Sequence, residues 1–256
     1  RIASDGEAIV RPLAVARCDI DRLLGAGLFP MSGPFAVGHE CVGEITALGD
    51  AVRGLAIGQR VVVSFQLSCG RCARCRAGHS AVCEAMPTLS DYGMQPLSGT
   101  EYGGMLSDLI RVPFADAMLR PIASHLESVA LASVSDNVPD GYRAVAPHLA
   151  ARPGSEVLIV NHGLASIPLY ALQAALALGA TGVDFASDDA ESLAIAERLG
   201  ARPVETDFAG RPPRTYGIVV DAGVTPTGLA YAIRATEPEG ICQSVSFHPG
   251  KTTPMP

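Results

Sequence analysis

The second half of the chain alternates short apolar runs with segments of helical periodicity. Residues 154–160 form a short apolar run of the kind expected for a buried parallel strand. Four further strands are predicted at residues 181–187, 202–205, 216–223 and 240–247. Helical spacing occurs before and between them, at residues 136–150, 166–180 and 188–201. In the first of these helices, the predicted apolar face consists of Val138, Tyr142, Val145 and Leu149. Strand and helix in this order predict a doubly wound parallel sheet.

The first half of the chain has a different pattern. Strand-like runs occur at residues 7–15, 37–49 and 58–66, and two shorter runs lie within residues 101–122. Glycine and proline interrupt these runs, and no helical period of any length appears. The sequence therefore predicts an α/β protein with a β-rich domain over residues 1–133 and a sheet-and-helix domain over residues 134–256.

The composition narrows the class of protein. Hydrophobic residues make up 48% of the chain and charged residues 18%, which is typical of a folded globular protein. The net charge of −7 repels phosphate backbones, so nucleic acid is a poor partner. No apolar run could span a bilayer and no signal-peptide core opens the chain, so we expect a soluble, cytoplasmic protein with no membrane contact. The chain begins without Met inside a strand pattern, and we expect it to be a fragment.

Four of the seven cysteines lie between residues 69 and 83. Cys69, Cys72, Cys75 and Cys83 follow the spacing C-x2-C-x2-C-x7-C. Thiolates bind Zn²⁺ tetrahedrally, and four sulfurs leave no open position for a substrate. Free or oxidised thiols are the alternative, although disulfides between cysteines three residues apart would be strained. The spacing therefore favours a structural zinc site that organises a loop.

A second group of possible metal ligands is spread along the first half. Cys18, His39, Glu40 and Asp136 offer a thiolate, an imidazole and carboxylates, a mixed set that can leave one coordination position open. Each residue alone has an ordinary explanation, because a lone Cys is usually a core residue and Asp136 could cap the helix after it. Residue types alone favour these structural roles over a catalytic metal.

The segment from residue 157 to residue 187 has the layout of a dinucleotide site. A strand, a short turn and a helix are followed by a second strand, which would place a pyrophosphate at the helix N-terminus. The glycine motif is weak, because a reading from Gly163 puts Ala165 and Pro168 where the later glycines belong. His162 lies in the same turn, where it could contact a phosphate or face water.

These motifs follow one another in a single order. The chain contains, in this order, the sequence GHE at residues 38–40, the cysteine cluster after a GQRVVV strand, the run GGMLSDLIRVP and the strand–helix–strand segment. Together they resemble the zinc-dependent medium-chain dehydrogenase/reductase family, the alcohol dehydrogenase superfamily. The run SDNVPDGYRA at residues 135–144 is similar to the branch whose third protein ligand is Asp, which includes glutathione-independent formaldehyde dehydrogenases.

The resemblance implies a GroES-like β domain that holds two zinc ions and a Rossmann domain that binds a nicotinamide cofactor. It implies that the catalytic zinc is bound by Cys18, His39 and Asp136, that Glu40 can approach the metal, and that Asp21 orients His39. The structural zinc would be held by the four clustered cysteines. The implied reaction is hydride transfer between an alcohol or aldehyde and the nicotinamide, in a homo-oligomer of two or four subunits.

The implied cofactor site combines the phosphate turn with the end of the next strand. Its residues are Gly163, Leu164, Ala165, Ser166, Ile167, Ser187 and Asp188. NAD is favoured over NADP, because acidic residues beside Ser187 would repel a 2′-phosphate and no Arg adjoins them.

Several positions depart from the family pattern. Family members usually have Ser or Thr two residues after the ligand Cys, where the hydroxyl relays the substrate proton, and this chain has Ile20. Together with Ala165 and Pro168, Ile20 keeps open a second interpretation, a non-catalytic relative that retains the fold and the structural zinc as a binding or regulatory protein. Family members also return to the β domain in a further segment, which we expect to lie beyond Pro256.

Overall fold

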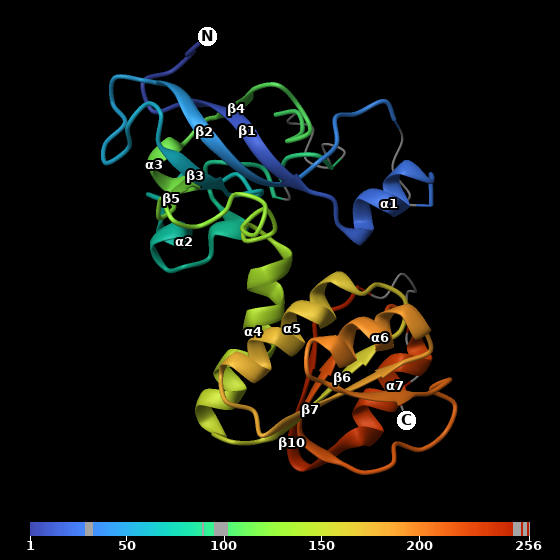
Figure 1. Ribbon diagram of the computed structural model, residues 1–256. Coiled ribbons are helices and arrows are strands. Elements are labelled where there is room, and N and C mark those ends of the chain that lie inside the picture. The colour runs from blue at the N-terminus through green and yellow to red at the C-terminus, as the bar shows by residue number, and fades with distance from the viewer. Residues whose placement is uncertain (29–32, 89, 95–101, 248–251, 253–254, 256) are drawn as a thin grey trace. The chain divides into compact units, whose positions relative to one another are not determined.

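The computed structural model describes residues 1–28, 33–88, 90–94, 102–247, 252 and 255. The chain divides into two compact units, Arg1–Asp136 and Asn137–Pro256, both drawn in Figure 1. Each unit has its own sheet and its own hydrophobic core. The candidate metal ligands all lie in the first unit, and the candidate dinucleotide turn lies in the second.

The described part of the first unit contains an antiparallel sheet of five strands. They are β1 (Ala8–Ala16), β2 (Glu40–Leu48), β3 (Arg60–Val63), β4 (Ile110–Val112) and β5 (Leu119–Pro121), in the spatial order β4-β1-β2-β3-β5. At one end of the β1–β2 pair, Ala16 lies opposite Glu40. This pairing brings the residues that follow β1 beside the residues that precede β2, and Cys18 and His39 lie in these two positions.

Short helices connect these strands. They are α1 (Asp19–Gly25), α2 (Ala73–Arg76), the 3₁₀ helix η1 (Ser80–Val82) and α3 (Ala115–Met118). The expectation that the first half lacks helices is therefore wrong, because elements of three to seven residues are too short to show a helical period.

In its described residues, the second unit has a parallel sheet of five strands in the order β10-β9-β6-β7-β8. Figure 1 labels β6, β7 and β10 of this sheet. The strands are β6 (Glu156–Asn161), β7 (Gly182–Ser187), β8 (Arg202–Glu205), β9 (Tyr216–Asp221) and β10 (Thr236–Ser244). The helices are α4 (Asn137–Ala151), α5 (Ser166–Ala177), α6 (Ala190–Arg198) and α7 (Pro226–Ala235).

Helices cover both faces of this sheet. Side chains of α4, α5 and α6 pack with Val157 and Ile159 in one core cluster, whereas α7 packs with Leu158 and Val160 in another. Successive residues of β6 therefore point to opposite faces, and both faces are buried, as expected for a parallel strand. The predicted α/β class and doubly wound sheet are confirmed.

The buried face of α4 differs in part from the predicted one. Val145 and Leu149 are buried as expected, but Tyr142 is 51% exposed, and Gly141 and Ala144 lie in the buried face instead. A Cβ at Gly141 would lie 2.6 Å from the backbone N of Ala171 in α5, so the two helices meet there almost backbone to backbone. The prediction from helical periodicity was wrong here because it places large apolar side chains in the buried face. This contact between helices instead requires a residue that has no side chain.

No described helix is both long and apolar enough to cross a membrane.

We expect Gly141→Ala to destabilise the second unit despite the better helix propensity of alanine. Alanine gains roughly 0.5–1 kcal/mol in a helix interior, whereas overpacking typically costs about 1–3 kcal/mol. The net result should be a lower midpoint in denaturant unfolding followed by far-UV circular dichroism. Gly210→Ala is the matched control, because a Cβ there would have no atom within 4 Å. Equal midpoints for the two variants would contradict the close helix contact.

Candidate functional site

The backbone of Cys18 is fixed by the first turn of α1. Cys18 immediately precedes this helix, and its N–H donates a 2.9 Å hydrogen bond to Oδ2 of Asp21. A carboxylate at the third helical position commonly accepts this bond and holds the helix N-terminus. The side chain of Cys18 is buried.

His39 directly precedes β2, at a place where two segments of the chain lie very close together. Gly38 has φ +91°, and a Cβ there would lie 2.7 Å from the backbone N of Leu106. A side chain at position 38 would push this segment away, so glycine is required directly before His39. His39 and Glu40 are both buried.

Three candidate ligands meet at the ring of His39. Nε2 lies 3.3 Å from Sγ of Cys18 and 3.5 Å from Oδ2 of Asp136. Zinc bonds of about 2.0–2.3 Å at tetrahedral angles place neighbouring ligand atoms roughly 3.5 Å apart. Each of the two measured separations is one that two ligands of a single zinc ion would show, although the set whose ligand atoms all lie close together contains Glu40 rather than Asp136. Ligand atoms of Cys18, His39 and Glu40 also lie within 4.8 Å of one another.

Asp21 faces the other nitrogen of the same ring. Its Oδ1 lies 3.4 Å from Nδ1 of His39, and both side chains are buried. Burial lowers the pKa of His39, but the interactions with Asp21 and Cys18 outweigh it and raise the pKa to about 11. The same negative field that holds a proton on Nε2 favours a metal cation at that position.

Glu40 is held by the segment that also carries Asp136. Its Oε1 accepts a 2.6 Å hydrogen bond from Oγ of Ser133, and both residues are buried. Ser133 lies three residues before Asp136, and their backbones are joined by a 3.4 Å hydrogen bond from Asp136 N–H to Ser133 C=O. The segment of residues 133–136 therefore positions two carboxylates at once.

Sequence reasoning missed three residues around this centre. Ser133 binds Glu40, and the ring of Phe65 lies edge-on to His39 with centroids 5.9 Å apart. Burial raises the pKa of Asp91 to about 6, opposed by the charge of His39, and its buried Oδ1 has no hydrogen-bond partner among the described residues. No spacing links these residues to the ligands, because only the tertiary fold brings them near.

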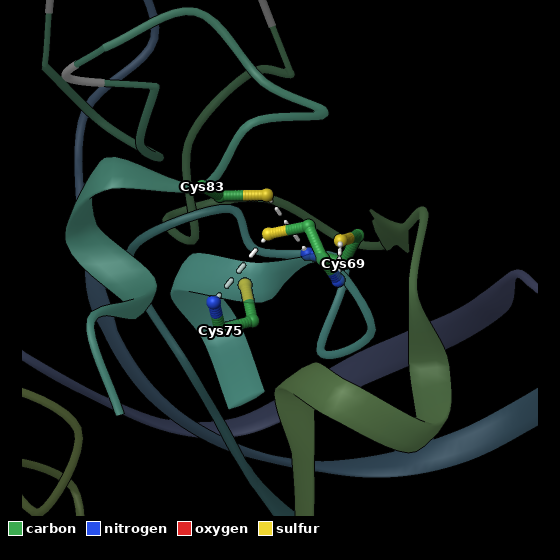
Figure 2. Close-up of side chains that lie close together, drawn as sticks. Cys69, Cys75 and Cys83 are labelled. Atoms are coloured by element: carbon green, nitrogen blue, oxygen red, sulfur yellow. Dashed lines mark hydrogen bonds between the residues drawn. The ribbon is translucent and has the colours of Figure 1, made fainter. Parts of the chain in front are cut away.

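The cysteine cluster forms a separate cage in the first unit. The sulfurs of Cys69, Cys72, Cys75 and Cys83 lie within 4.8 Å of one another, and all are free of disulfides. Figure 2 shows the labelled side chains of Cys69, Cys75 and Cys83 gathered around α2 and the loop before it. Four close sulfurs fit a closed tetrahedral zinc site.

Backbone N–H groups point at the sulfurs of this cage. Cys72 Sγ accepts from the N–H of Cys75 at 3.4 Å and of Glu84 at 3.5 Å. These bonds lower the pKa of Cys72 to about 6. Similar bonds run from Cys69 N–H to Cys83 Sγ and from Cys72 N–H to Cys69 Sγ. The loop thus favours the thiolate form of Cys72 and Cys69, whereas burial and the neighbouring cysteines raise the pKa of Cys75 to about 12.

The candidate dinucleotide turn joins β6 to α5 in the second unit. Gly163 has φ +123°, and a Cβ there would lie 2.7 Å from Cγ2 of Val224. The turn then runs through Leu164 and Ala165, and α5 begins at Ser166 and Ile167. Gly163 is exposed, so its backbone can approach a ligand, whereas Pro168 is buried and offers no N–H.

Ser187 and Asp188 have different environments at the end of β7. Ser187 is fully buried, and its Oγ accepts hydrogen bonds from Asn161 Nδ2 and from the N–H of Asp189. The side chain of Asp188 is 45% exposed and lies 3.3 Å from Nε2 of His162. Asp188 is therefore the residue of the two that a ligand can reach.

Residues 4–122 match the family described as alcohol dehydrogenase GroES-like domain. A probable zinc-binding alcohol dehydrogenase of Mycobacterium tuberculosis is 31% identical over 97% of this chain and 63% of its own length. A geraniol dehydrogenase of Castellaniella defragrans is 30% identical over 98% of this chain and 71% of its own length. The chain belongs to the zinc medium-chain dehydrogenase/reductase family.

A solved medium-chain dehydrogenase/reductase structure agrees with this assignment. The alcohol dehydrogenase from Thermus sp. ATN1 has a TM-score of 0.89 and 26% identity, over 100% of this chain and 74% of that one. The chain spans 63% of the length of the Mycobacterium tuberculosis relative.

We expect Cys75→Ser to remove about one zinc ion per chain, because three thiolates and a hydroxyl bind zinc far less well than four thiolates. Zinc released on denaturation would be measured with a colorimetric chelator. Loss of the cage should also expose the loop to trypsin, which cleaves after Arg71, Arg74 and Arg76. Cys242→Ser is the control, because Cys242 belongs to neither cluster. Unchanged zinc content in Cys75→Ser would contradict a metal-filled cage.

Proposed function

We propose that this chain carries the catalytic and cofactor-binding units of a zinc-dependent oxidoreductase. It would transfer a hydride between an alcohol or aldehyde and a nicotinamide dinucleotide. The observation that carries this proposal is the placement of Nε2 of His39 at 3.3 Å from the sulfur of Cys18 and 3.5 Å from a carboxylate oxygen of Asp136. The first unit, Arg1–Asp136, would hold both zinc ions, and the second would bind the cofactor.

The donor set supports a catalytic rather than a structural metal in this place. One thiolate, one imidazole and one carboxylate occupy three positions and leave a fourth for substrate oxygen. A bound zinc ion supplies Lewis-acid activation of that oxygen, and a bound nicotinamide supplies the hydride acceptor. The residues of the chain bind, orient and neutralise these groups.

Asp21 and Ser133 would act through the ligands that they hold. The carboxylate of Asp21, whose Oδ1 lies 3.4 Å from Nδ1 of His39, would favour the proton on Nδ1 and so leave Nε2 as the ligand atom. Ser133 keeps Glu40 oriented beside the metal ligands through its 2.6 Å hydrogen bond. Both are positioning residues, because neither is placed to touch a substrate oxygen on the metal.

Removal of the substrate proton requires a route that Ile20 does not offer. Its side chain has no group that can accept or donate a proton. We propose that water or a nearby carboxylate takes this role, so the proton transfer lacks the hydroxyl relay usual in the family.

NAD is the proposed cofactor. The partly exposed carboxylate of Asp188 would lie near the adenosine end of a dinucleotide that crosses β6 and β7. A 2′-phosphate at about 4 Å from this carboxylate is repelled by roughly 1 kcal/mol or more. Asp189 adds a second negative charge as the N-cap of α6.

The test uses the full-length protein that contains this chain, with zinc measured in the same preparation. We expect about two zinc ions per chain and turnover of at least one compound among primary alcohols, polyols, amino alcohols and formaldehyde, faster with NAD than with NADP. Asp136→Ala should lose the catalytic zinc and lower kcat/KM by more than about 100-fold. Asp140→Ala is the control, because Asp140 pairs with Arg143 on α4 and belongs to neither group of candidate metal ligands.

Two results would overturn the proposal. One is a wild-type protein with a single zinc ion that neither turns over any member of the panel nor binds NADH. This result would favour the non-catalytic interpretation. The other is full zinc content and full activity in Asp136→Ala, which would remove the carboxylate from the ligand set.

Ile20→Thr should raise kcat, because it restores a hydroxyl two residues after the ligand Cys18. Positioned acid–base groups typically contribute about 10²–10⁴-fold, so a rise of at least about tenfold is expected. The pH profile of kcat should shift as well, since the proton would leave through a different group. Ile20→Val is the control that shortens the side chain without adding a hydroxyl. Equal gains in both variants would show that side-chain volume, rather than proton transfer, limits the rate.

A further inference from the structure

His162 connects the carboxyl ends of neighbouring strands in the second unit. It follows β6, whereas Asp188 follows β7 and Thr225 lies after β9. Its Nε2 lies 3.3 Å from Oδ2 of Asp188, and its Nδ1 lies 2.5 Å from Oγ1 of Thr225. The imidazole therefore spans the edge at which open α/β sheets bind their ligands.

One hydrogen-bond arrangement satisfies both nitrogens of the ring. Thr225 is the N-cap of α7, and its Oγ1 accepts a hydrogen bond from the N–H of Gly228. The hydroxyl proton of Thr225 can then be donated to Nδ1 of His162, and Nε2–H can be donated to Asp188. The two bonds fix the plane of the ring.

A buried aromatic side chain supports one face of this ring. Phe208 is fully buried and stacks on His162, with centroids 4.6 Å apart and planes 19° from parallel. Phe208 in turn packs edge-on against Tyr231, with centroids 5.4 Å apart. His162 is therefore the outermost ring of an aromatic column, and its side chain keeps 21% exposure.

Two glycines give the ring its room. A Cβ at Gly223 or at Gly228 would lie 3.2 or 3.3 Å from Cβ of His162. Such contacts are tighter than ordinary packing, so larger residues there would shift the imidazole. The ring is held by two hydrogen bonds, supported by Phe208 and left clear by neighbours without side chains.

We propose that the face of the His162 ring opposite Phe208 is the platform on which the adenine of the nicotinamide dinucleotide stacks. This inference rests on the proposed function, since it assigns a residue to the cofactor of that reaction. Gly163, exposed beside it, lets the backbone approach the pyrophosphate. A planar base gains affinity by stacking on an aromatic ring whatever its hydrogen-bonding edge, and a ring already backed by Phe208 has little freedom to lose on binding.

The experiment separates the two halves of the cofactor. AMP and nicotinamide mononucleotide are titrated calorimetrically into the full-length zinc-loaded protein, and NADH is titrated by fluorescence. Base–aromatic stacking corresponds to about 5- to 150-fold in affinity. His162→Ala should therefore weaken AMP and NADH by at least about fivefold and leave nicotinamide mononucleotide unchanged.

A second variant keeps the stacking surface and removes the ring nitrogens. His162→Phe should bind AMP within about threefold of the wild type, because Phe can stack on Phe208 and on adenine alike. His125→Ala is a control for histidine loss at an exposed position outside this unit. Far-UV circular dichroism and the unfolding midpoint establish that each variant is folded.

Three outcomes would overturn the proposal that adenine stacks on His162. The first is unchanged or tighter AMP binding by folded His162→Ala, which would show that the ring only fills space. The second is equal loss in His162→Phe and His162→Ala, which would assign the effect to the hydrogen bonds with Asp188 and Thr225. Either of these leaves the proposed function intact. The third is a wild-type protein that binds neither AMP nor NADH, and this outcome overturns the cofactor assignment together with the platform.

Discussion

The ring of His39, held between Asp21 on one nitrogen and Cys18 with Asp136 on the other, is the interaction on which the candidate metal centre depends. A buried thiol and buried carboxylates around one imidazole would be costly if their charges were uncompensated. A cation at Nε2 removes that cost, because it pairs with the thiolate and the carboxylate together. The sheet serves this arrangement, since the register of β1 and β2 places the segments of Cys18 and His39 at one end.

The second unit reaches its candidate ligand site by different means. Its turn has one strained glycine, Gly163, where dinucleotide folds usually have several. Ala165 and Pro168 stand where the later glycines would be, and the side chain of His162, directly before Gly163, is hydrogen-bonded to residues that follow both neighbouring strands. The weak glycine motif therefore reflects a different set of side-chain contacts at this edge of the sheet.

The periodicity of apolar residues and the spacing of the cysteines were sufficient to predict much of the architecture. The alternating strands and helices of the second half depend on local patterns, and the four cysteines lie close enough in sequence for their spacing to define a cage. The candidate ligands Cys18, His39 and Asp136 could be grouped only through a family resemblance, because their proximity to one another depends on strand pairing and on a distant segment.

Other features were missed for definable physical reasons. The buried face of α4 runs through Gly141, and a contact made by a missing side chain leaves no apolar signal. Ser133, Phe65 and Asp91 became recognisable only when the fold placed them around His39. Ser187 and Asp188 are adjacent and polar, yet one lies in the core and the other faces solvent, and only the direction of the final strand residue distinguishes them.

The N–H groups directed at the sulfurs of the cysteine cage have a consequence for chemical durability. A thiolate that accepts hydrogen bonds is a weaker nucleophile, because its electron density is drawn toward the donors. Cys72 accepts two such bonds while remaining partly open to solvent. In a zinc-loaded cage, where every sulfur is already a thiolate, the turns that assemble the cage should therefore also slow its attack on alkylating agents and peroxides. In the absence of metal the same hydrogen bonds would have the opposite effect, because the lowered pKa of Cys72 raises the fraction of reactive thiolate.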